Sequence, residues 1–468
     1  MAERQNIVVS EEEMAQQRNY IAEVKKMTGG GKYKINTYGC QMNAHDSEKL
    51  EGMLTQMGMT PAANREEADF VIFNTCCVRD NAQRRALGNV VWLKELKKTR
   101  PELMVGVCGC MMQQPGMGEQ ILKQYPFVDL AFGTHNLYRF AQLMLKAVQS
   151  RRRVVEVIQD DEGSIPEDLP VRRSSPYHAY ITIMYGCNNF CSYCIVPYVR
   201  GRERSRASAR IIEEARELKA DGVKEIMLLG QNVNSYGLDV EGELSFAQLL
   251  SELDKVGIER IRFMTSHPKD ISDELIDVMA SGKHICHALH LPVQHGNNRI
   301  LQSMNRRYTR EKYLERVEAI RSKVPDISLT TDLIVGYPGE TEEEFEETCS
   351  LVEQVGYDSA FTFIYSPRVG TRAADMPDQI PEEVSSRRIQ KLIALQKDVT
   401  HKRYANYIGQ VHSVLVEEAS RRDENQMAGK NEYNITVNFP GDKSLIGQIV
   451  RVKITSAGES TLRGERVE

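Results

Sequence analysis

The first third of the chain alternates between two hydrophobic patterns. Short apolar runs rich in β-branched and aromatic residues, the pattern of strands, occupy residues 32–38, 70–74, 103–107 and 128–132. Stretches with helical spacing follow them, at residues 44–57, 75–98, after 110, and at 137–149. Strands and helices that alternate in this way predict a doubly wound parallel sheet, which binds ligands at the carboxyl ends of its strands.

The alternation resumes at residue 179 and predicts a second α/β unit. Its strands are expected at residues 179–185, 225–229, 260–264, 288–293, 328–335 and 359–365. Amphipathic stretches such as 209–219, 246–256 and 313–323 separate these strands, and a helix over 381–404 ends the unit. Six parallel strands are fewer than the eight of a closed barrel, so the pattern predicts a partial (β/α)6 barrel.

The last part of the chain changes character. Residues 410–417, 432–439 and 445–455 are short, alternating and β-branched, which predicts a small antiparallel β-barrel of a kind that often binds nucleic acid. The predicted divisions are a mobile extension at 1–31, an N-terminal domain at 32–150, a linker at 151–175, the partial barrel at 176–403 and the small barrel at 404–468.

Cys187, Cys191 and Cys194 stand at offsets of four and three residues, in the loop after the strand at 179–185. Soft thiolates at such spacing select iron–sulfur clusters, zinc or copper(I). A structural zinc site takes four protein ligands, and no fourth Cys or His follows closely. A [4Fe-4S] cube with one open iron therefore fits better than a zinc site that borrows a distant ligand.

Three further cysteines share one topological position. Cys40, Cys76 and Cys110 each follow a strand of the first predicted sheet, so they are expected to meet at its carboxyl edge. Spacing alone leaves Cys77 and Cys108 as competing ligands, and unrelated buried cysteines are the alternative for the whole set. Cys286 and Cys349 have no partners at metal spacing, and both are predicted to be core residues.

Composition excludes several classes of protein. The net charge of −5 gives no general attraction to nucleic acid, so any RNA contact must come from local patches. The arginine runs at 151–153 and 172–173 are predicted to be solvated linker rather than such a contact. The polar first 30 residues do not have the pattern of a signal peptide, and no window approaches the apolar length of a membrane span. Ten clustered cysteines indicate metal binding in a reducing cytosol.

Several motifs together resemble the radical SAM (S-adenosylmethionine) methylthiotransferase family over about residues 33–466. They are TYGCQMN at 37–43, NTCCVR at 74–79, Gly109-Cys110, YGC at 185–187 with the cysteines up to Cys194, IVPYVRGR at 195–202 and LPVQHG at 291–296. The resemblance implies an N-terminal cluster domain, a radical SAM barrel and a C-terminal TRAM domain. It also implies two [4Fe-4S] clusters, a sulfur-transferring one on Cys40, Cys76 and Cys110 and a SAM-binding one on Cys187, Cys191 and Cys194.

The runs at 39–43 and 132–136 are most similar to the members of this family that modify tRNA. They imply 2-methylthiolation of N6-isopentenyladenosine at position 37, with threonylcarbamoyladenosine tRNA or a ribosomal protein as alternative substrates. Two SAM molecules would serve each turnover, one giving a 5′-deoxyadenosyl radical and one a methyl group. A non-catalytic RNA-binding module fits less well, because a purely structural metal site would close its ligand shell.

The resemblance also directs attention to residues beside the first cysteine loop. Tyr193 is a candidate contact for the SAM adenine, with simple packing as the alternative, and Gly230 and Gln231 are candidates for the SAM amino acid moiety. Arg202, or another arginine of the run 200–206, would suit the SAM carboxylate or an RNA phosphate. The implied partners of this cytoplasmic, monomeric enzyme are the tRNA anticodon stem-loop, an electron donor such as flavodoxin or ferredoxin, and an Fe–S carrier.

Overall fold

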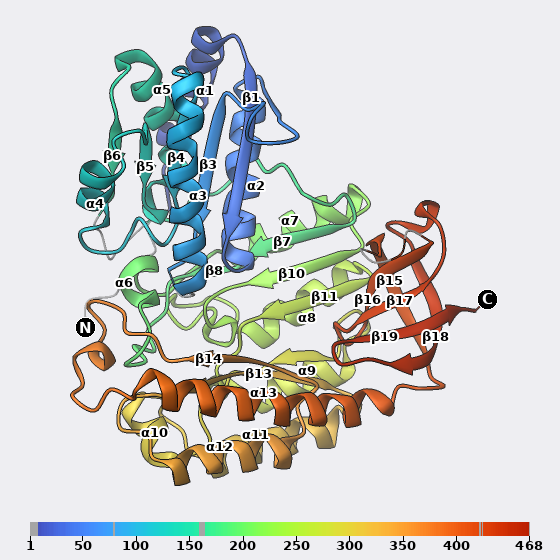
Figure 1. Cartoon of the computed structure of the whole chain (residues 1–468). Helices are drawn as coiled ribbons and strands as arrows, with labels where there is room; N and C mark the ends of the chain where they lie inside the picture. Colours follow the sequence, from blue (N-terminus) through green and yellow to red (C-terminus); the bar gives the residue numbers. More distant parts are fainter. Residues whose placement is uncertain (1–7, 78–79, 159–163, 421–422, 424, 468) are drawn as a thin grey trace.

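The computed structural model describes residues 8–77, 80–158, 164–420, 423 and 425–467, with no side chains described at 80–82. Residues 78–79 of the NTCCVR motif therefore lie outside the described part. A six-stranded sheet forms the upper lobe in Figure 1, a partial barrel lies below it, and a small closed barrel lies to the right. No described helix is long and apolar enough to cross a membrane.

The upper lobe is a parallel sheet with helices on both faces, as the sequence predicts. Its strand order is β2-β1-β3-β4-β5-β6, with β1 (Gly31–Tyr38), β2 (Met59–Pro61), β3 (Phe70–Thr75), β4 (Met104–Cys108), β5 (Leu130–Phe132) and β6 (Val154–Glu156). One face is covered by α1 (Glu11–Thr28), α2 (Gln41–Gln56) and α5 (Phe140–Ser150). The other is covered by α3 (Asp80–Thr99) and α4 (Met117–Gln124).

Two predictions about the flanks of this lobe are wrong. The expected mobile extension contains α1, which Ser10 caps by accepting a hydrogen bond from the Glu13 N–H. Ile21 and Val24 of this helix are buried in the same apolar cluster as α5, so the helix belongs to the lobe. The expected linker contributes β6, which extends the sheet beside β5.

The second unit is the predicted partial barrel. Its strands are β7 (His178–Thr182), β10 (Glu225–Leu229), β11 (Arg260–Met264), β12 (Ala288–His290), β13 (Ser328–Val335) and β14 (Ser359–Ile364). A parallel bridge between Ile261 and Ile285 joins its two three-stranded sheets, and no pairing between described residues closes β14 onto β7. The outer helices are α7 (Ser208–Ala220), α8 (Phe246–Val256), α9 (Asp273–Ser281), α11 (Arg310–Lys323), α12 (Glu342–Val355) and α13 (Glu382–Ala405).

The predicted strand at 179–185 is split. Its end forms β8 (Met184–Tyr185), which leaves the barrel sheet and pairs with β9 (Arg204–Ser205). This small ribbon closes the base of the loop that carries Cys187, Cys191 and Cys194.

The C-terminal barrel has five strands rather than the three predicted. It is closed in the order β15-β16-β17-β19-β18, from β15 (Val411–Ala419), β16 (Gln426–Asn431), β17 (Thr436–Pro440), β18 (Ile449–Ala457) and β19 (Thr461–Arg466). The predicted antiparallel barrel is confirmed in four of its strand pairs, and the fifth pair, β17 with β19, runs parallel. The pattern missed β16 and β19 because Ala, Gly, Lys and Glu have low strand propensity.

Buried charges join the small barrel to the amino ends of β10 and β11. Arg262 donates a hydrogen bond to the Asn431 carbonyl at 2.6 Å and forms an ion pair with Glu225 at 2.9 Å. Arg260 donates to the Ser413 carbonyl at 2.6 Å. All three charged side chains are at most 5% exposed, so carbonyls of the small barrel add to the ion pairs with Glu225 in offsetting their desolvation.

We expect Arg262→Met to destabilise the protein by about 3 kcal/mol, because it leaves the buried Glu225 carboxylate with weaker compensation. Urea unfolding should show the loss, and limited proteolysis should cut faster between α13 and β15. Arg210→Met is the matched control, since Arg210 pairs with Asp168 at an exposed site and its loss should cost below about 0.5 kcal/mol. Equal stability of the two variants would contradict this role of Arg262.

Candidate metal centre

Cys187, Cys191 and Cys194 lie on one tight loop between β8 and α6 (Val196–Arg200). The Cys194 N–H donates to the Cys191 carbonyl at 2.9 Å, and the Cys187 N–H donates to the Gly201 carbonyl at 3.1 Å. Burial raises the pKa of Cys187 to about 12, and it raises the pKa of Cys194 well above its usual range. Clustered thiols that resist ionisation without a counter-charge fit a site completed by a cationic group.

A second loop, after α10 (Asn298–Ser303), packs against the loop that carries these cysteines. This second loop supplies Arg306, which is 4% exposed. Its guanidinium donates to the Cys191 sulfur at 3.4 Å, to the Pro292 carbonyl at 2.6 Å and to the Tyr308 hydroxyl at 3.0 Å. Sequence analysis missed Arg306, because its only signal is an ordinary arginine more than 100 residues from the cysteines.

The second cysteine set occupies the predicted edge of the upper sheet. Cys40 caps α2, Cys76 follows β3 and Cys110 follows β4. The Cys76 thiol donates to Cys40 and lowers its pKa, and the Arg200 charge lowers it further. The pKa of Cys110 is lowered in the same way, by a hydrogen bond from the Cys77 thiol and by the charge of Arg200. The lowered pKa of each thiol favours the thiolate, the form that binds metal.

The competing cysteines differ in their surroundings. Cys108 lies in the apolar core of the sheet, and burial raises its pKa well above the usual range, as for a packing residue. Cys77 packs against Cys110 with Ile195 and Val199 of the other unit, so its sulfur stays beside the set. Geometry thus separates Cys108 from the ligands but leaves Cys77 as an alternative to Cys76.

Two buried amides and a glycine shape the turns that carry these thiols. The Asn74 amide donates to the Asn43 carbonyl at 2.9 Å, and the Asn43 amide donates back to Asn74 Oδ1 at 3.2 Å. Gly109, directly before Cys110, has φ +93°, and a Cβ there would lie 2.3 Å from Asn74 Oδ1. A larger residue at 109 would therefore push the Cys110 turn away from the Cys76 turn.

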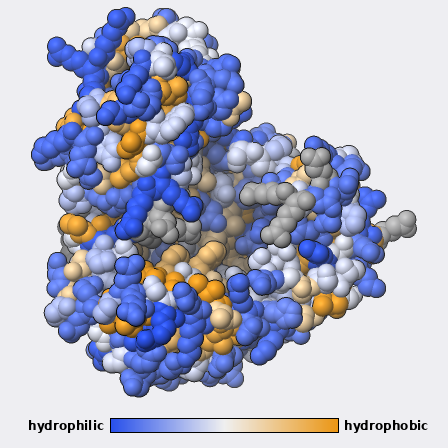
Figure 2. Space-filling view, in the orientation of Figure 1, coloured by the Kyte–Doolittle hydropathy of each residue, from blue (hydrophilic) through white to orange (hydrophobic). Residues whose placement is uncertain are grey.

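Contacts between the units bring the two sets to one region. Arg200, six residues after Cys194, donates to the Cys110 sulfur at 3.1 Å and to Asp46 Oδ2 at 2.8 Å. Cys40 packs against an apolar cluster inside the barrel, which includes Met227. Figure 2 shows that the molecule is hollowed where its three parts meet.

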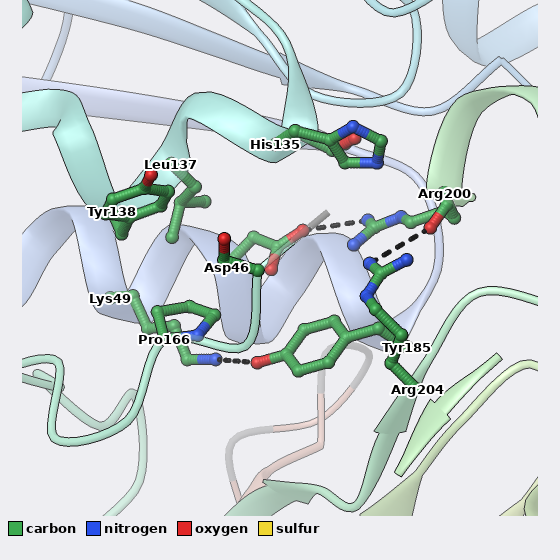
Figure 3. Close-up of a pocket in the computed structure, with 11 residues that line it drawn as sticks. Asp46, Lys49, His135, Leu137, Tyr138, Pro166, Tyr185, Arg200 and Arg204 are labelled. Atoms are coloured by element: carbon green, nitrogen blue, oxygen red, sulfur yellow. Dashed lines mark hydrogen bonds and ion pairs between the residues drawn. The ribbon is translucent and has the colours of Figure 1, made fainter. Parts of the chain in front are cut away.

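A cavity between the upper lobe and the barrel unit is too small for SAM. It measures about 30 Å³ and is lined by Asp46, Lys49, Tyr185, Arg200 and Arg204 among others (Figure 3). The Lys49 ammonium donates to the Tyr185 hydroxyl across it at 3.4 Å. Such a volume holds about one water molecule, so this cavity is a polar seam between the units rather than the substrate site.

Unsatisfied polar groups mark the carboxyl ends of β10 and β11 instead. Neither amide atom of Asn234 has a hydrogen-bond partner in the described chain, and the same is true of Ser266 Oγ and His267 Nε2. These side chains are at most 8% exposed, and a buried group left without a partner costs about 1–3 kcal/mol. A polar ligand that supplies the missing bonds fits this place, which sequence analysis found only through the neighbouring Gly230 and Gln231.

The other predicted SAM contacts lie within the first cysteine loop and after it. Tyr193 packs against the apolar cluster of Met304 and Tyr337, so packing explains its position without a ligand. Arg202 is exposed, and its guanidinium stacks 4.2 Å from the Phe190 ring centroid. Arg200, Arg204 and Arg206, the rest of that basic run, are buried rather than solvated.

Two sets of three cysteine thiols are a donor type that holds iron–sulfur clusters. Within the described residues, no three Cys, His, Asp or Glu side chains converge closely enough to hold a single metal ion. A cube gives each thiolate a different iron, so its ligands lie farther apart than the ligands of one ion.

Comparison with known families gives three matches along the chain. Residues 181–352 match the radical SAM superfamily, 32–133 match Uncharacterized protein family UPF0004, and 405–467 match the TRAM domain. A relative from Thermoanaerobacter sp. (strain X514), named tRNA-2-methylthio-N(6)-dimethylallyladenosine synthase, is 52% identical over 99% of both chains. A relative of the same name from Alkaliphilus oremlandii (strain OhILAs) is 50% identical over the full length of both.

The chain belongs to the tRNA-2-methylthio-N(6)-dimethylallyladenosine synthase family. Membership of the radical SAM superfamily brings with it a [4Fe-4S] cluster and SAM. Among solved structures, a radical S-adenosylmethionine methyltransferase, TsrM, from Kitasatospora setae has a TM-score of 0.50 at 15% identity. It covers 71% of this chain and 72% of its own, and this likeness shows the fold alone.

We expect Gly109→Ala to remove iron from the second set only, because the new Cβ collides with Asn74. If each set holds one cube, reconstituted protein should fall from about eight irons per chain to about four. Gly116→Ala is the matched control, since Gly116 also has a positive φ but no atom lies within 4 Å of its Cβ position. Full iron content in Gly109→Ala would contradict the assigned role of this turn.

Proposed function

We propose that this protein is a methylthiotransferase that converts N6-isopentenyladenosine at position 37 of tRNA to its 2-methylthio derivative. The main observation behind this proposal is that two sets of three cysteines lie at the carboxyl ends of strands in two units. Arg200, six residues after one set, contacts a sulfur of the other. Full-length relatives at 50–52% identity support the same activity. An unreactive C–H on an adenine ring calls for radical chemistry, which a cofactor must supply.

On this proposal, Cys187, Cys191 and Cys194 hold the SAM-binding cluster. Cys40, Cys76 and Cys110 hold a second one. When bound, the clusters and two SAM molecules supply a radical, a sulfur atom and a methyl group. The protein positions these groups: Asn234, Ser266 and His267 offer unpaired polar atoms to SAM beside Gly230 and Gln231. Tyr193 and Arg202 complete the candidate SAM contacts.

The RNA would bind across the face that Figure 2 shows as hollowed. A base that reacts at ring carbon 2 must leave its stack, and single-stranded anticodon loops release bases at low cost. The TRAM-type barrel is proposed to hold the anticodon stem-loop. The proposal further includes an external electron donor such as flavodoxin or ferredoxin, an Fe–S carrier, a monomeric state and a cytoplasmic location.

Iron and sulfide analysis after anaerobic reconstitution tests the two-cluster assignment. We expect about eight irons per chain in wild type and about four in Cys187→Ala/Cys191→Ala/Cys194→Ala. Mössbauer spectra of both should show cubes. About four irons in wild type and none in the triple variant would mean that the second set holds no cluster, and sulfur insertion would have to be withdrawn.

Nucleoside mass spectrometry tests the substrate. Reconstituted protein with SAM and a reductant should add a methylthio group to tRNA carrying N6-isopentenyladenosine. tRNA carrying unmodified adenosine or threonylcarbamoyladenosine at position 37 should stay unchanged, since the pocket must recognise the N6 substituent. Product on the threonylcarbamoyl tRNA alone would overturn the proposed substrate while keeping the reaction class.

A further inference from the structure

Each cysteine set contains one buried guanidinium in hydrogen-bond contact with a sulfur. Arg200 lies 3.1 Å from the Cys110 sulfur, and Arg306 lies 3.4 Å from the Cys191 sulfur. The two arginines are 5% and 4% exposed. Solvent therefore does little to screen either charge from the sulfur it contacts.

Arg200 is held in this position from both units. Its Nε donates to the Cys110 sulfur, its Nη2 donates to Asp46 of α2, and its backbone belongs to α6. Val199 packs against Cys110 and Cys77, and its carbonyl accepts a hydrogen bond from Thr134 at 2.8 Å. The contact with Cys110 therefore exists only when α6 is seated on the upper lobe.

Hydrogen bonds to ligand sulfur and nearby positive charge favour the reduced, more negative state of an iron–sulfur cluster. We propose that Arg200 is a positioning residue that raises the reduction potential of the second cluster, and that Arg306 does the same, separately, for the SAM-binding cluster. This inference rests on the proposed function, because it requires a cluster on Cys40, Cys76 and Cys110. It makes the electronic state of the second cluster depend on a residue from the other unit.

Redox titration followed by electron paramagnetic resonance tests the inference without turnover. In the Cys187→Ala/Cys191→Ala/Cys194→Ala background only the second cluster remains. There, Arg200→Gln should shift its potential to a more negative value, beyond the scatter of replicate titrations. Asp46→Asn should shift it to a more positive value, because a carboxylate beside Cys110 is removed. A general loosening of the site would not give opposite signs.

Arg306 provides the matched control. Arg306→Gln should leave the potential of the second cluster unchanged. In the reciprocal Cys40→Ala/Cys76→Ala/Cys110→Ala background, Arg306→Gln should lower the remaining potential and Arg200→Gln should not. If Arg200→Gln takes up no iron, Arg200→Lys, which keeps the charge but loses the planar donor, should give a smaller negative shift.

The possible results distinguish a failure of this inference from a failure of the proposed function. An intact cube with an unshifted potential in Arg200→Gln would overturn this inference and leave the proposed function standing. A triple variant that holds no cube at all would overturn both. Equal shifts of both clusters on either substitution would overturn the separate tuning.

Discussion

A cube held by three thiolates requires three sulfurs that approach one small volume from different directions, and the rest of the structure follows from that requirement. On the proposed function, the chain meets it in two ways. A single loop carries Cys187, Cys191 and Cys194, closed at its base by the β8–β9 ribbon. The upper sheet instead uses strand topology, because parallel strands end at one edge and place Cys40, Cys76 and Cys110 together across 70 residues of sequence.

Burying charge beside these sulfurs constrains how the parts of the molecule can move. Removing a guanidinium from water costs several kcal/mol, which is recovered only with good partners. Arg200 has Asp46 and Cys110, and both belong to the upper lobe. Arg262 has Glu225 and the carbonyl of Asn431, which joins the two barrels. Separation of the upper lobe would leave Arg200 without either partner, and separation of the small barrel would remove the Asn431 carbonyl from Arg262.

The sequence predicts what depends on local pattern and misses what depends on distant contacts. Alternating strands and helices gave the parallel sheet and partial barrel, and the shared position after a strand brought Cys40, Cys76 and Cys110 together. The helix α1 was missed because its few apolar residues, such as Ile21 and Val24, are buried only by packing against distant parts of the lobe, such as α5. Strands such as β16 lack β-branched residues and form only because the barrel closes. Arg306 approaches Cys191 through the fold alone, so no local pattern could identify it.

The two ends of the partial barrel carry different features, and this arrangement limits how an RNA can bind. The cysteines and the unsatisfied polar groups lie at the carboxyl ends of the strands, whereas the C-terminal barrel packs on the amino ends of β10 and β11. On the proposed function, an RNA held by the C-terminal barrel must extend across the partial barrel to place a base beside the cysteine sets. Since acidic residues slightly outnumber basic ones after residue 403, phosphate attraction alone cannot hold it there. On the proposed function, the shape of a folded RNA therefore has to contribute to recognition beside its charge.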